Sequence, residues 1–242
     1  MDPKVEKLNA LAEDRLRNLP LPKLREKSLA ALTSNLDRAE SRYGLIKSVA
    51  ERYGVDPEEL FAKYVIETRG AANPESPGTS SAGASGPFQL MPDIRETFIN
   101  PKISDPFERE ADAAARLMAD IQKRNKFSPD MLSVAYNYGE GNLRDWGGNA
   151  VAELPQESVN YVAYSQHLRP ELKRRAVERR RKAMEMELLE AKASVPAPEY
   201  KKQGFIDYMK GEPSPTDVAL ADHYRQVKAK QDAVRQRYPE FQ

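Results

Sequence analysis

The sequence predicts an all-α protein with little or no β-sheet. No stretch alternates apolar and polar residues over roughly four residues or more, as a half-exposed strand would. Apolar residues recur instead at helical spacing, and Asp56-Pro57 and Asp105-Pro106 each combine an N-cap residue with a proline at the first helical position. We therefore expect an α-rich domain at residues 39–170 with helical arms at both ends.

The composition excludes several classes of site. The 38 Lys and Arg residues balance 37 Asp and Glu, so the net charge of +1 does not indicate a nucleic-acid partner. With no cysteine there is no disulfide, thiolate metal ligand or cysteine nucleophile, and two distant histidines, His167 and His223, exclude a His-rich metal site. No apolar run approaches the roughly 18 residues of a membrane span, so no membrane span is predicted.

The two ends of the chain are expected to be helical arms. Residues 1–38 carry leucines among many charges and are broken near Pro20 and Pro22, which favours an arm packed on the domain over a chemical role. The amino terminus has neither the apolar region nor the cleavage site of a secretory signal, so synthesis in the cytoplasm is expected.

The carboxyl-terminal arm is divided into three parts. Residues 171–193 are expected to form an exposed charged helix, with eight basic and five acidic residues; a basic patch for an anionic polymer is the alternative. Residues 194–216 read as a Pro-rich linker and residues 217–242 as a C-terminal helix.

Within the domain, the spacing predicts a series of helices and one loop. Residues 70–85 are rich in Gly, Ala, Ser, Asn and Pro without periodicity, which is typical of a loop. The expected helices lie at 39–53, from Pro57 to about Glu67, at 87–97, from Pro106 to about Lys126, and at 129–138, where Gly139 and Gly141 end the last of them.

Glu67 is the first candidate for chemistry. It follows Leu60 and Tyr64 at helical spacing, so a carboxylate ends an apolar stripe near the C-terminus of a helix. Desolvation and the negative end of the helix dipole would both raise its pKa, as a general acid requires near neutral pH. The alternative is a surface glutamate at a frayed helix end.

Three motifs follow Glu67 in the same domain. They are the small-residue stretch 80–92, the segment Ala135-Tyr136-Asn137-Tyr138-Gly139-Glu140-Gly141-Asn142 and the helix start at 154–162. Gln89, in the first motif, can both donate and accept hydrogen bonds, as sugar amide and hydroxyl groups require. Taken singly, Gln89 could be an ordinary surface glutamine, and a tyrosine such as Tyr136 is more often part of a core.

In this order, the motifs resemble the catalytic domain of soluble lytic transglycosylases, the goose-type-lysozyme-like glycosidases that cleave bacterial peptidoglycan. The resemblance covers about residues 43–168. It rests on Glu67, Ser80, Gly83-Ala84, Gly86, Gln89-Leu90-Met91-Pro92, Ala135-Tyr136-Asn137, Gly139, Gly141 and Asn160-Tyr161-Val162. Thr68 replaces the usual serine, Pro87-Phe88 replaces leucine-methionine and is expected to reshape the cleft wall, and the loop between Glu67 and Ser80 is longer.

The resemblance implies a lysozyme-like fold and a mechanism with one carboxylate. Glu67 would protonate the glycosidic oxygen between N-acetylmuramic acid and N-acetylglucosamine, then accept the proton of the muramic 6-hydroxyl as a 1,6-anhydro ring closes. A partner carboxylate, as ordinary glycosidases use, is not evident: Glu75 lies in the loop, and Asp93 and Glu96 have no clear partner.

The remaining site residues are assigned by the same resemblance. Sugar amide or hydroxyl groups are expected to bind Ser80, Gln89 and Asn137, while Met91 and Tyr136 shape the cleft. Tyr161 is expected to orient Glu67 or the intermediate. No metal or cofactor is required, and the expected partner is the peptidoglycan glycan strand.

Two other functions and one location complete the expectations. A hydrolytic muramidase, such as an endolysin released through a holin, would use water in place of the 6-hydroxyl. A non-catalytic structural protein could retain the fold. We expect a phage virion component that opens the wall in the host periplasm during genome entry, with the arms at 1–38 and 171–242 bound to other tail or ejection proteins; a bacterial protein with a dedicated secretion apparatus is the alternative.

Overall fold

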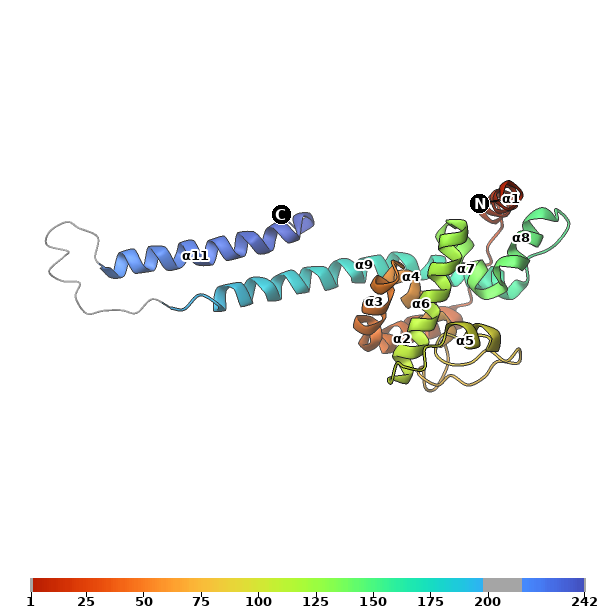
Figure 1. Ribbon diagram of the computed structural model, residues 1–242, viewed down its shortest axis with the longest axis horizontal. Helices are drawn as coiled ribbons and strands as arrows, with labels where there is room; N and C mark the ends of the chain where they lie inside the picture. Colours follow the sequence, from red (N-terminus) through yellow and green to blue (C-terminus); the bar gives the residue numbers. More distant parts are fainter. Residues whose placement is uncertain (1, 198–214, 242) are drawn as a thin grey trace. The chain divides into compact units, whose positions relative to one another are not determined.

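The computed structural model describes residues 2–197 and 215–241, and most of the expected linker at 194–216 lies outside these residues. The described residues are helical and contain no strand, only an isolated antiparallel bridge between Ser85 and Leu90. The predicted all-α class is confirmed. No helix in the described ranges is long and apolar enough to cross a membrane. The elements (Figure 1) are α1 (Pro3–Arg17), α2 (Glu26–Ala39), η1 (Glu40–Arg42), α3 (Tyr43–Arg52), α4 (Pro57–Glu67), α5 (Pro92–Phe98), α6 (Pro106–Asn125), α7 (Pro129–Tyr138), α8 (Glu140–Gly148), α9 (Gln156–Ala193), α11 (Pro215–Arg237) and η2 (Pro239–Phe241).

The chain divides into two compact units, Met1–Lys173 and Arg174–Gln242. The charged stretch 171–193 is the second half of α9, which runs through Pro170 without ending there. In the second unit, α11 is antiparallel to that half of α9. Tyr238 Oη donates to Glu187 at 2.8 Å, whereas Lys230, nearer the start of α11, donates to Ser194 Oγ at 2.8 Å. The expected division of the chain into five segments stays a prediction.

Several helices of the first unit start where the sequence predicted. The Asp56 carboxylate accepts from Glu58 N at 2.8 Å, and the Asp105 carboxylate accepts from Glu108 N at 2.7 Å, so each caps the following helix. The expected helix at 87–97 is wrong at its start, because α5 begins only at Pro92. Residues 85–90 form a tight hairpin there instead.

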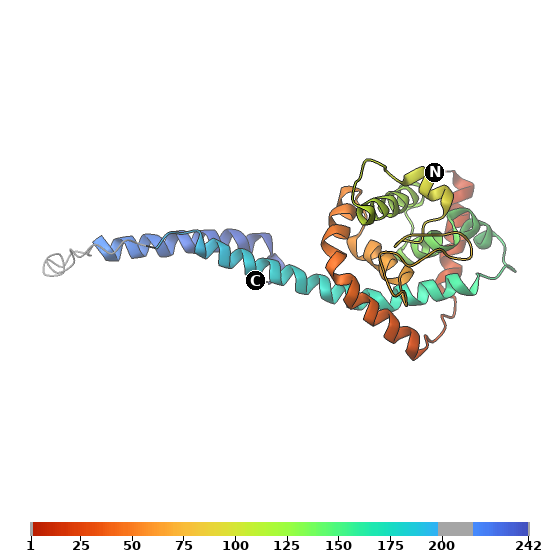
Figure 2. The ribbon, with the colours of Figure 1, turned by 90° about the horizontal axis from the view of Figure 1, so that it is seen from below.

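Helix α4 is the central helix of the first unit. All of its residues from 59 to 66 are buried, and it contacts α2, α3 and α6, which lie around it (Figure 2). A helix that is apolar on most of its sides is stable only when neighbours cover it. The burial of α4 therefore fixes the position of its last residue, Glu67, at the edge of the core.

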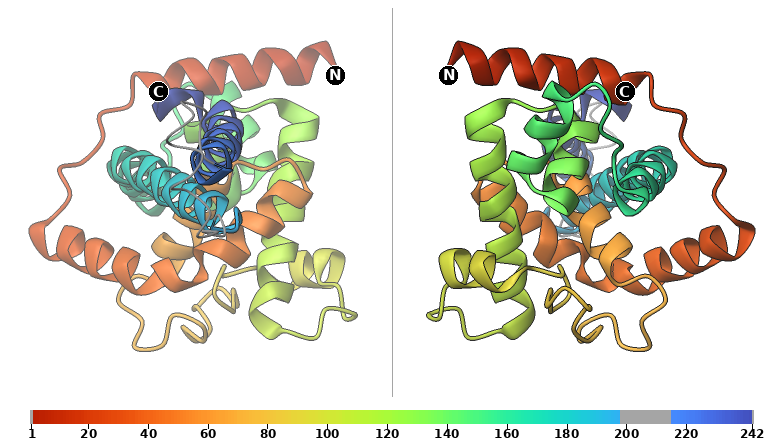
Figure 3. Two further views of the ribbon diagram at one scale, coloured as in Figure 1. Left: turned by 90° about the vertical axis from the view of Figure 1, so that its left-hand side faces the viewer. Right: turned by 90° about the vertical axis from the view of Figure 1, so that its right-hand side faces the viewer.

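Helix α8 was not predicted, because its sequence contains three glycines. Two of them allow α1 to approach closely (Figure 3): a Cβ on Gly147 would lie 2.6 Å from Ala12 Cβ and 2.8 Å from the Leu8 carbonyl oxygen. The Arg15 guanidinium lies 4.2 Å from the centroid of the Trp146 ring, a favourable cation–π contact. The N-terminal arm thus packs on the domain, as expected.

Helix α2 provides hydrogen bonds to the C-terminal end of α4. The Asn35 amide is buried and donates to the Val65 carbonyl at 2.7 Å and to Thr68 Oγ1 at 2.8 Å. Thr68 in turn donates to the Tyr64 carbonyl at 2.6 Å. Since the last carbonyls of a helix have no partner within it, the bond from Asn35 satisfies the Val65 carbonyl directly before Glu67.

The loop after Glu67 is also held by the N-terminal segment. Arg38 donates to the Ala71 carbonyl at 3.1 Å, and Arg42 Nε donates to the Glu75 carboxylate at 2.7 Å. Glu75 is therefore a structural partner of Arg42. Residues 1–38, expected only to pack on the domain, thus bond to the chain before Glu67 through Asn35 and after it through Arg38.

Replacement of Asn35 by alanine should destabilise the first unit. The change removes three hydrogen bonds, two donated by the amide and one accepted from Arg38, and leaves a buried carbonyl at the end of α4 without a partner, which costs roughly 1–3 kcal/mol. Urea denaturation measures the free energy of unfolding. Asn18→Ala, at an exposed amide that donates to the Asp14 carbonyl at 2.9 Å, is the control. Equal losses in the two variants would contradict the role given to Asn35.

Candidate active site

Glu67 is the last residue of α4 and is partly buried. Desolvation by the surrounding protein raises the pKa of its carboxyl group from 4.5 to about 7, and the negative charge of Glu157 acts in the same direction. Tyr161, Arg69 and Lys63 oppose this rise but are outweighed. The carboxyl group is therefore close to half-ionised at neutral pH, which suits a group that must both give and take a proton.

Two tyrosines from different helices lie beside Glu67. Tyr161 of α9 is buried, and its hydroxyl has no hydrogen bond of standard geometry within the described residues. It nevertheless lies close enough to the Glu67 carboxylate to lower the pKa of that group, while burial and the charge of Glu67 raise the pKa of Tyr161 well above its usual value. Tyr161 thus has a hydroxyl proton available beside the acid.

Tyr136 of α7 links the surroundings of Glu67 to the loop that contains Phe88. Its hydroxyl donates to the Phe88 carbonyl at 2.8 Å, and burial, followed by the charge of Glu67, raises its pKa well above the usual value. Phe88 is fully buried, 5.7 Å from Tyr64 and 6.0 Å from Phe107 between ring centroids. Pro87 and Phe88 are both buried and anchor the loop in the core, and their expected effect on the cleft wall stays a prediction.

The hairpin at 85–90 depends on Gly86. Ser85 and Leu90 pair through backbone hydrogen bonds of 3.1 and 3.0 Å, which confines residues 86–89 to a tight turn. Gly86 has a φ of +77°, and a Cβ there would lie 2.8 Å from Glu110 Oε2. A side chain would be strained at this φ and would have to displace the Glu110 carboxylate, so both constraints favour glycine at position 86.

The expected substrate-binding residues of the loop are partly engaged with the loop itself. Gln89 Nε2 donates to the carbonyls of Gly86 at 3.0 Å and Gly78 at 3.1 Å. Ser80 is exposed, and its hydroxyl accepts from the Ala84 amide at 3.0 Å. Met91 is 39% exposed at the start of α5. The structure records no contact of Ser80 or Met91 with Glu67 among the described residues.

Asn137 is linked to the helix that carries Tyr161. Its Oδ1 accepts from Ser158 Oγ at 2.7 Å, which joins the end of α7 to the start of α9. The structure therefore brings Glu67, Tyr136 and Tyr161 together and ties Asn137 and Gln89 to their neighbours. Which of these residues bind substrate stays a prediction.

A second carboxylate, that of Glu157, acts on Glu67 and was not predicted from the sequence. Glu157 is exposed, but its charge reaches Glu67 and raises the pKa of that group. The signal was present, since Glu157 and Tyr161 are four residues apart and share a helix face. Among the described residues, no group of three or more His, Cys, Asp or Glu side chains could hold a metal ion.

The raised pKa of Glu67 has a consequence for stability. Since the native state holds this proton more tightly than the unfolded chain, the wild type should lose stability as the pH rises from about 4.5 to about 7. Glu67→Gln removes this loss, so between pH 4.5 and 8 the variant should gain roughly 1–3 kcal/mol relative to the wild type. Urea denaturation at both pH values measures the difference, with exposed Glu96→Gln as the control. An equal pH response of both variants would argue against a raised pKa.

One family model matches part of the first unit. Residues 44–159 match the family model of the transglycosylase SLT domain. A comparison with curated proteins found no significant match. A solved structure of an inactive mutant of the lytic transglycosylase Slt from Pseudomonas aeruginosa matches with 20% identity and a TM-score of 0.36, over 51% of this chain and 21% of that one. The chain thus spans about a fifth of that protein. Residues 44–159, a little under half of the chain, are thus similar to the transglycosylase SLT domain.

Proposed function

We propose that this protein is a peptidoglycan lytic transglycosylase that cleaves the β-1,4 bond between N-acetylmuramic acid and N-acetylglucosamine without water. The observation that carries the proposal is Glu67, a carboxyl group poised near pH 7 at the end of a buried helix inside an SLT domain. The same group can supply a proton in one step and remove one in the next.

Glu67 alone can both donate and accept the protons that the reaction transfers. The protonated carboxyl gives its proton to the glycosidic oxygen, which takes the electron pair of the breaking bond to C1 of the muramic residue. The 2-acetamido carbonyl oxygen of that sugar stabilises the electron-poor C1. The 6-hydroxyl oxygen then bonds to C1 and loses its proton to the Glu67 carboxylate, which returns to its starting form as the 1,6-anhydro ring closes.

Tyr161 has a distinct part in this cycle. Its hydroxyl, beside Glu67 and without another acceptor of standard geometry in the described residues, stabilises the ionised form of Glu67 between the two proton transfers. The hydroxyl of Tyr136 is engaged with Phe88, so Tyr136 would present its ring to the sugar.

The amide side chains are proposed to bind the sugar through the atoms that the fold leaves available. Gln89 would use its amide oxygen, because its nitrogen donates to two loop carbonyls. Asn137 would use its amide nitrogen, because its oxygen accepts from Ser158. Ser80 and Met91 are exposed on the same loop and would contact sugars further along the strand.

A hydrolytic muramidase is the second candidate function, and Glu157 is the observation that favours it. Inverting glycosidases use a second carboxylate that activates water on the opposite face of the sugar. Glu157 lies within electrostatic reach of Glu67 and is exposed, so it could serve as that base.

A role in a phage virion is the finer part of the proposal. Its support is the second compact unit, a helical hairpin outside the SLT domain that exposes Val177, Met186 and Leu189. Through this unit the chain would attach to other tail or ejection proteins and act on the wall in the host periplasm. Co-purification with virions is expected; a protein that stays monomeric and separates from virions would count against attachment.

Digestion of purified peptidoglycan by matched variants tests the proposed chemistry. We expect wild-type protein to release 1,6-anhydromuramic ends, detected by mass spectrometry. Loss of a general acid–base group costs typically 10²- to 10⁴-fold, so Glu67→Gln should lower the rate by about that factor, whereas Glu96→Gln should keep wild-type activity. Full activity of Glu67→Gln would remove Glu67 from the mechanism.

Glu157→Gln separates the two candidate functions. Under transglycosylation the variant should keep its rate within a few-fold and still yield anhydro ends, since no water needs activation. Reducing muramic ends from the wild type, together with a loss of about 10²-fold or more in Glu157→Gln, would establish hydrolysis instead.

A further inference from the structure

Lys63 is a fully buried cation on the helix that carries the proposed acid. It lies one turn before Glu67 in α4, and 0% of its surface is exposed. Lysine is almost never fully buried unless its ammonium group has partners. The proposed mechanism does not use Lys63, so its presence next to Glu67 needs a separate explanation.

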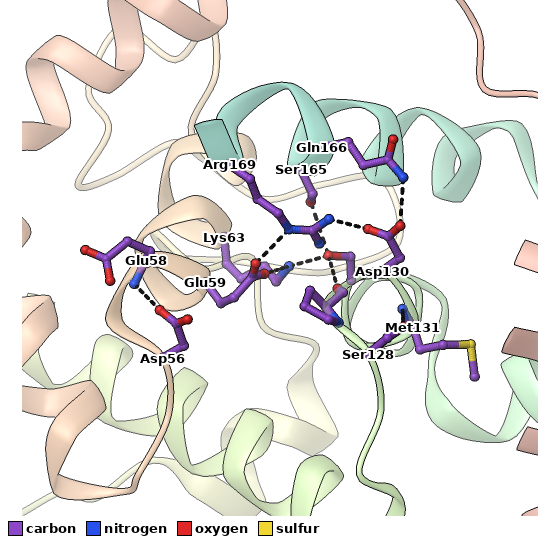
Figure 4. A network of polar contacts seen from close by, with 12 residues as sticks. Asp56, Glu58, Glu59, Lys63, Ser128, Asp130, Met131, Ser165, Gln166 and Arg169 are labelled. Carbon is purple, nitrogen blue, oxygen red and sulfur yellow. Dashed lines mark hydrogen bonds and ion pairs between the residues drawn. The ribbon is translucent and has the colours of Figure 1, made fainter. Parts of the chain in front are cut away.

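The Lys63 ammonium group joins three helices. It donates to Ser133 Oγ of α7 at 2.7 Å and lies 3.7 Å from Glu59 Oε2 on α4 (Figure 4). Ser133 donates to the Pro129 carbonyl at 2.9 Å. From α9, the ring of Tyr161 faces the ammonium group, with 5.4 Å between Lys63 Nζ and the ring centroid.

The nearest counter-charge is shared with a second cation. Arg169 of α9 donates through Nε to Glu59 Oε1 at 2.8 Å and also pairs with Asp130 of α7 (Figure 4). Burial lowers the pKa of Lys63 to about 8, with Arg169 acting in the same direction and Glu59 and Glu67 opposing. Lys63 is thus mostly charged at pH 7.

We propose that Lys63 is a positioning residue for Glu67, because its buried ammonium group holds the Tyr161 ring in place and sets a positive charge one helical turn before the carboxylate. This inference rests on the proposed role of Glu67 as acid and then base. Lys63 itself touches neither substrate nor the reacting atoms.

The charge of Lys63 limits the effect of burial on Glu67. The ionisable groups around Glu67 are Lys63 from its own helix, Arg69 from the loop, Tyr136 from α7, and Tyr161 and Glu157 from α9. Lys63 and Arg69 are the two cations among them, and Lys63 is the buried one, so solvent screens it less. Without Lys63, Glu67 would hold its proton to higher pH and would donate it less readily to the glycosidic oxygen in the first step.

An NMR titration of the full chain tests this coupling. The ¹³C shift of the Glu67 side-chain carboxyl, assigned by its absence in Glu67→Gln, is followed against pH in wild type and Lys63→Met. Removing a cation one turn away should raise the midpoint by about 0.5–1.5 pH units. Ser133→Ala is the matched control, because it removes the 2.7 Å hydrogen bond of Lys63 and leaves the charge; its midpoint should stay near that of the wild type.

The outcomes separate the inference from the proposed function. An unchanged Glu67 midpoint in Lys63→Met would overturn the inference, whatever the activity of the variant. If the inference holds, the alkaline limb of the kcat/KM profile on peptidoglycan should shift to higher pH by the same number of pH units as the NMR midpoint. A wild type that does not cleave peptidoglycan would overturn the proposed function while the NMR coupling stays measurable. If Lys63→Met does not fold, Lys63→Gln and the ¹³Cε titration of Lys63 in the wild type decide. A Lys63 midpoint below pH 6 would leave it neutral when Glu67 ionises and would contradict the inference.

Discussion

The desolvation of Glu67 at the end of α4 is the interaction on which the rest of the site depends. A glutamate in water would be ionised at neutral pH and could not act as an acid there. Because α2, α3 and α6 cover α4, its last residue lies where the charged form is disfavoured. The chemistry proposed for the domain is thus a consequence of how one helix is packed.

With desolvation alone, Glu67 would be a stable acid, but its ionised form, which must act as the base, would be too unfavourable. The single-carboxylate cycle needs the ionised form of Glu67 as an intermediate state, so the site must also contain groups that stabilise it. Tyr161 and Lys63 supply this stabilisation from within the core, and the two are in contact with one another. Together with the charge of Arg69, their opposition to burial leaves the pKa of Glu67 near 7, between the requirements of the two proton transfers.

Local signals in the sequence predicted much of the fold and the place of the candidate acid on its helix, whereas contacts between distant segments could not be predicted. The Asp56 and Asp105 caps and the place of Glu67 on α4 follow from neighbours in the chain. Asn35 looks like any polar residue of an amphipathic arm until α2 is seen against α4. From the sequence alone, Gly147 predicts a break in a helix. The structure shows that it instead allows the close approach of α1, a segment far away in the sequence.

The central claim is that Glu67 performs both proton transfers and that water takes no part. Digestion of peptidoglycan in H₂¹⁸O, followed by mass spectrometry of the released muramic ends, tests this claim most directly. The account predicts anhydro ends without ¹⁸O, because the oxygen that bonds to C1 comes from the 6-hydroxyl of the same sugar. Muramic ends that carry one ¹⁸O at C1 would contradict it and would assign the second step to an activated water molecule.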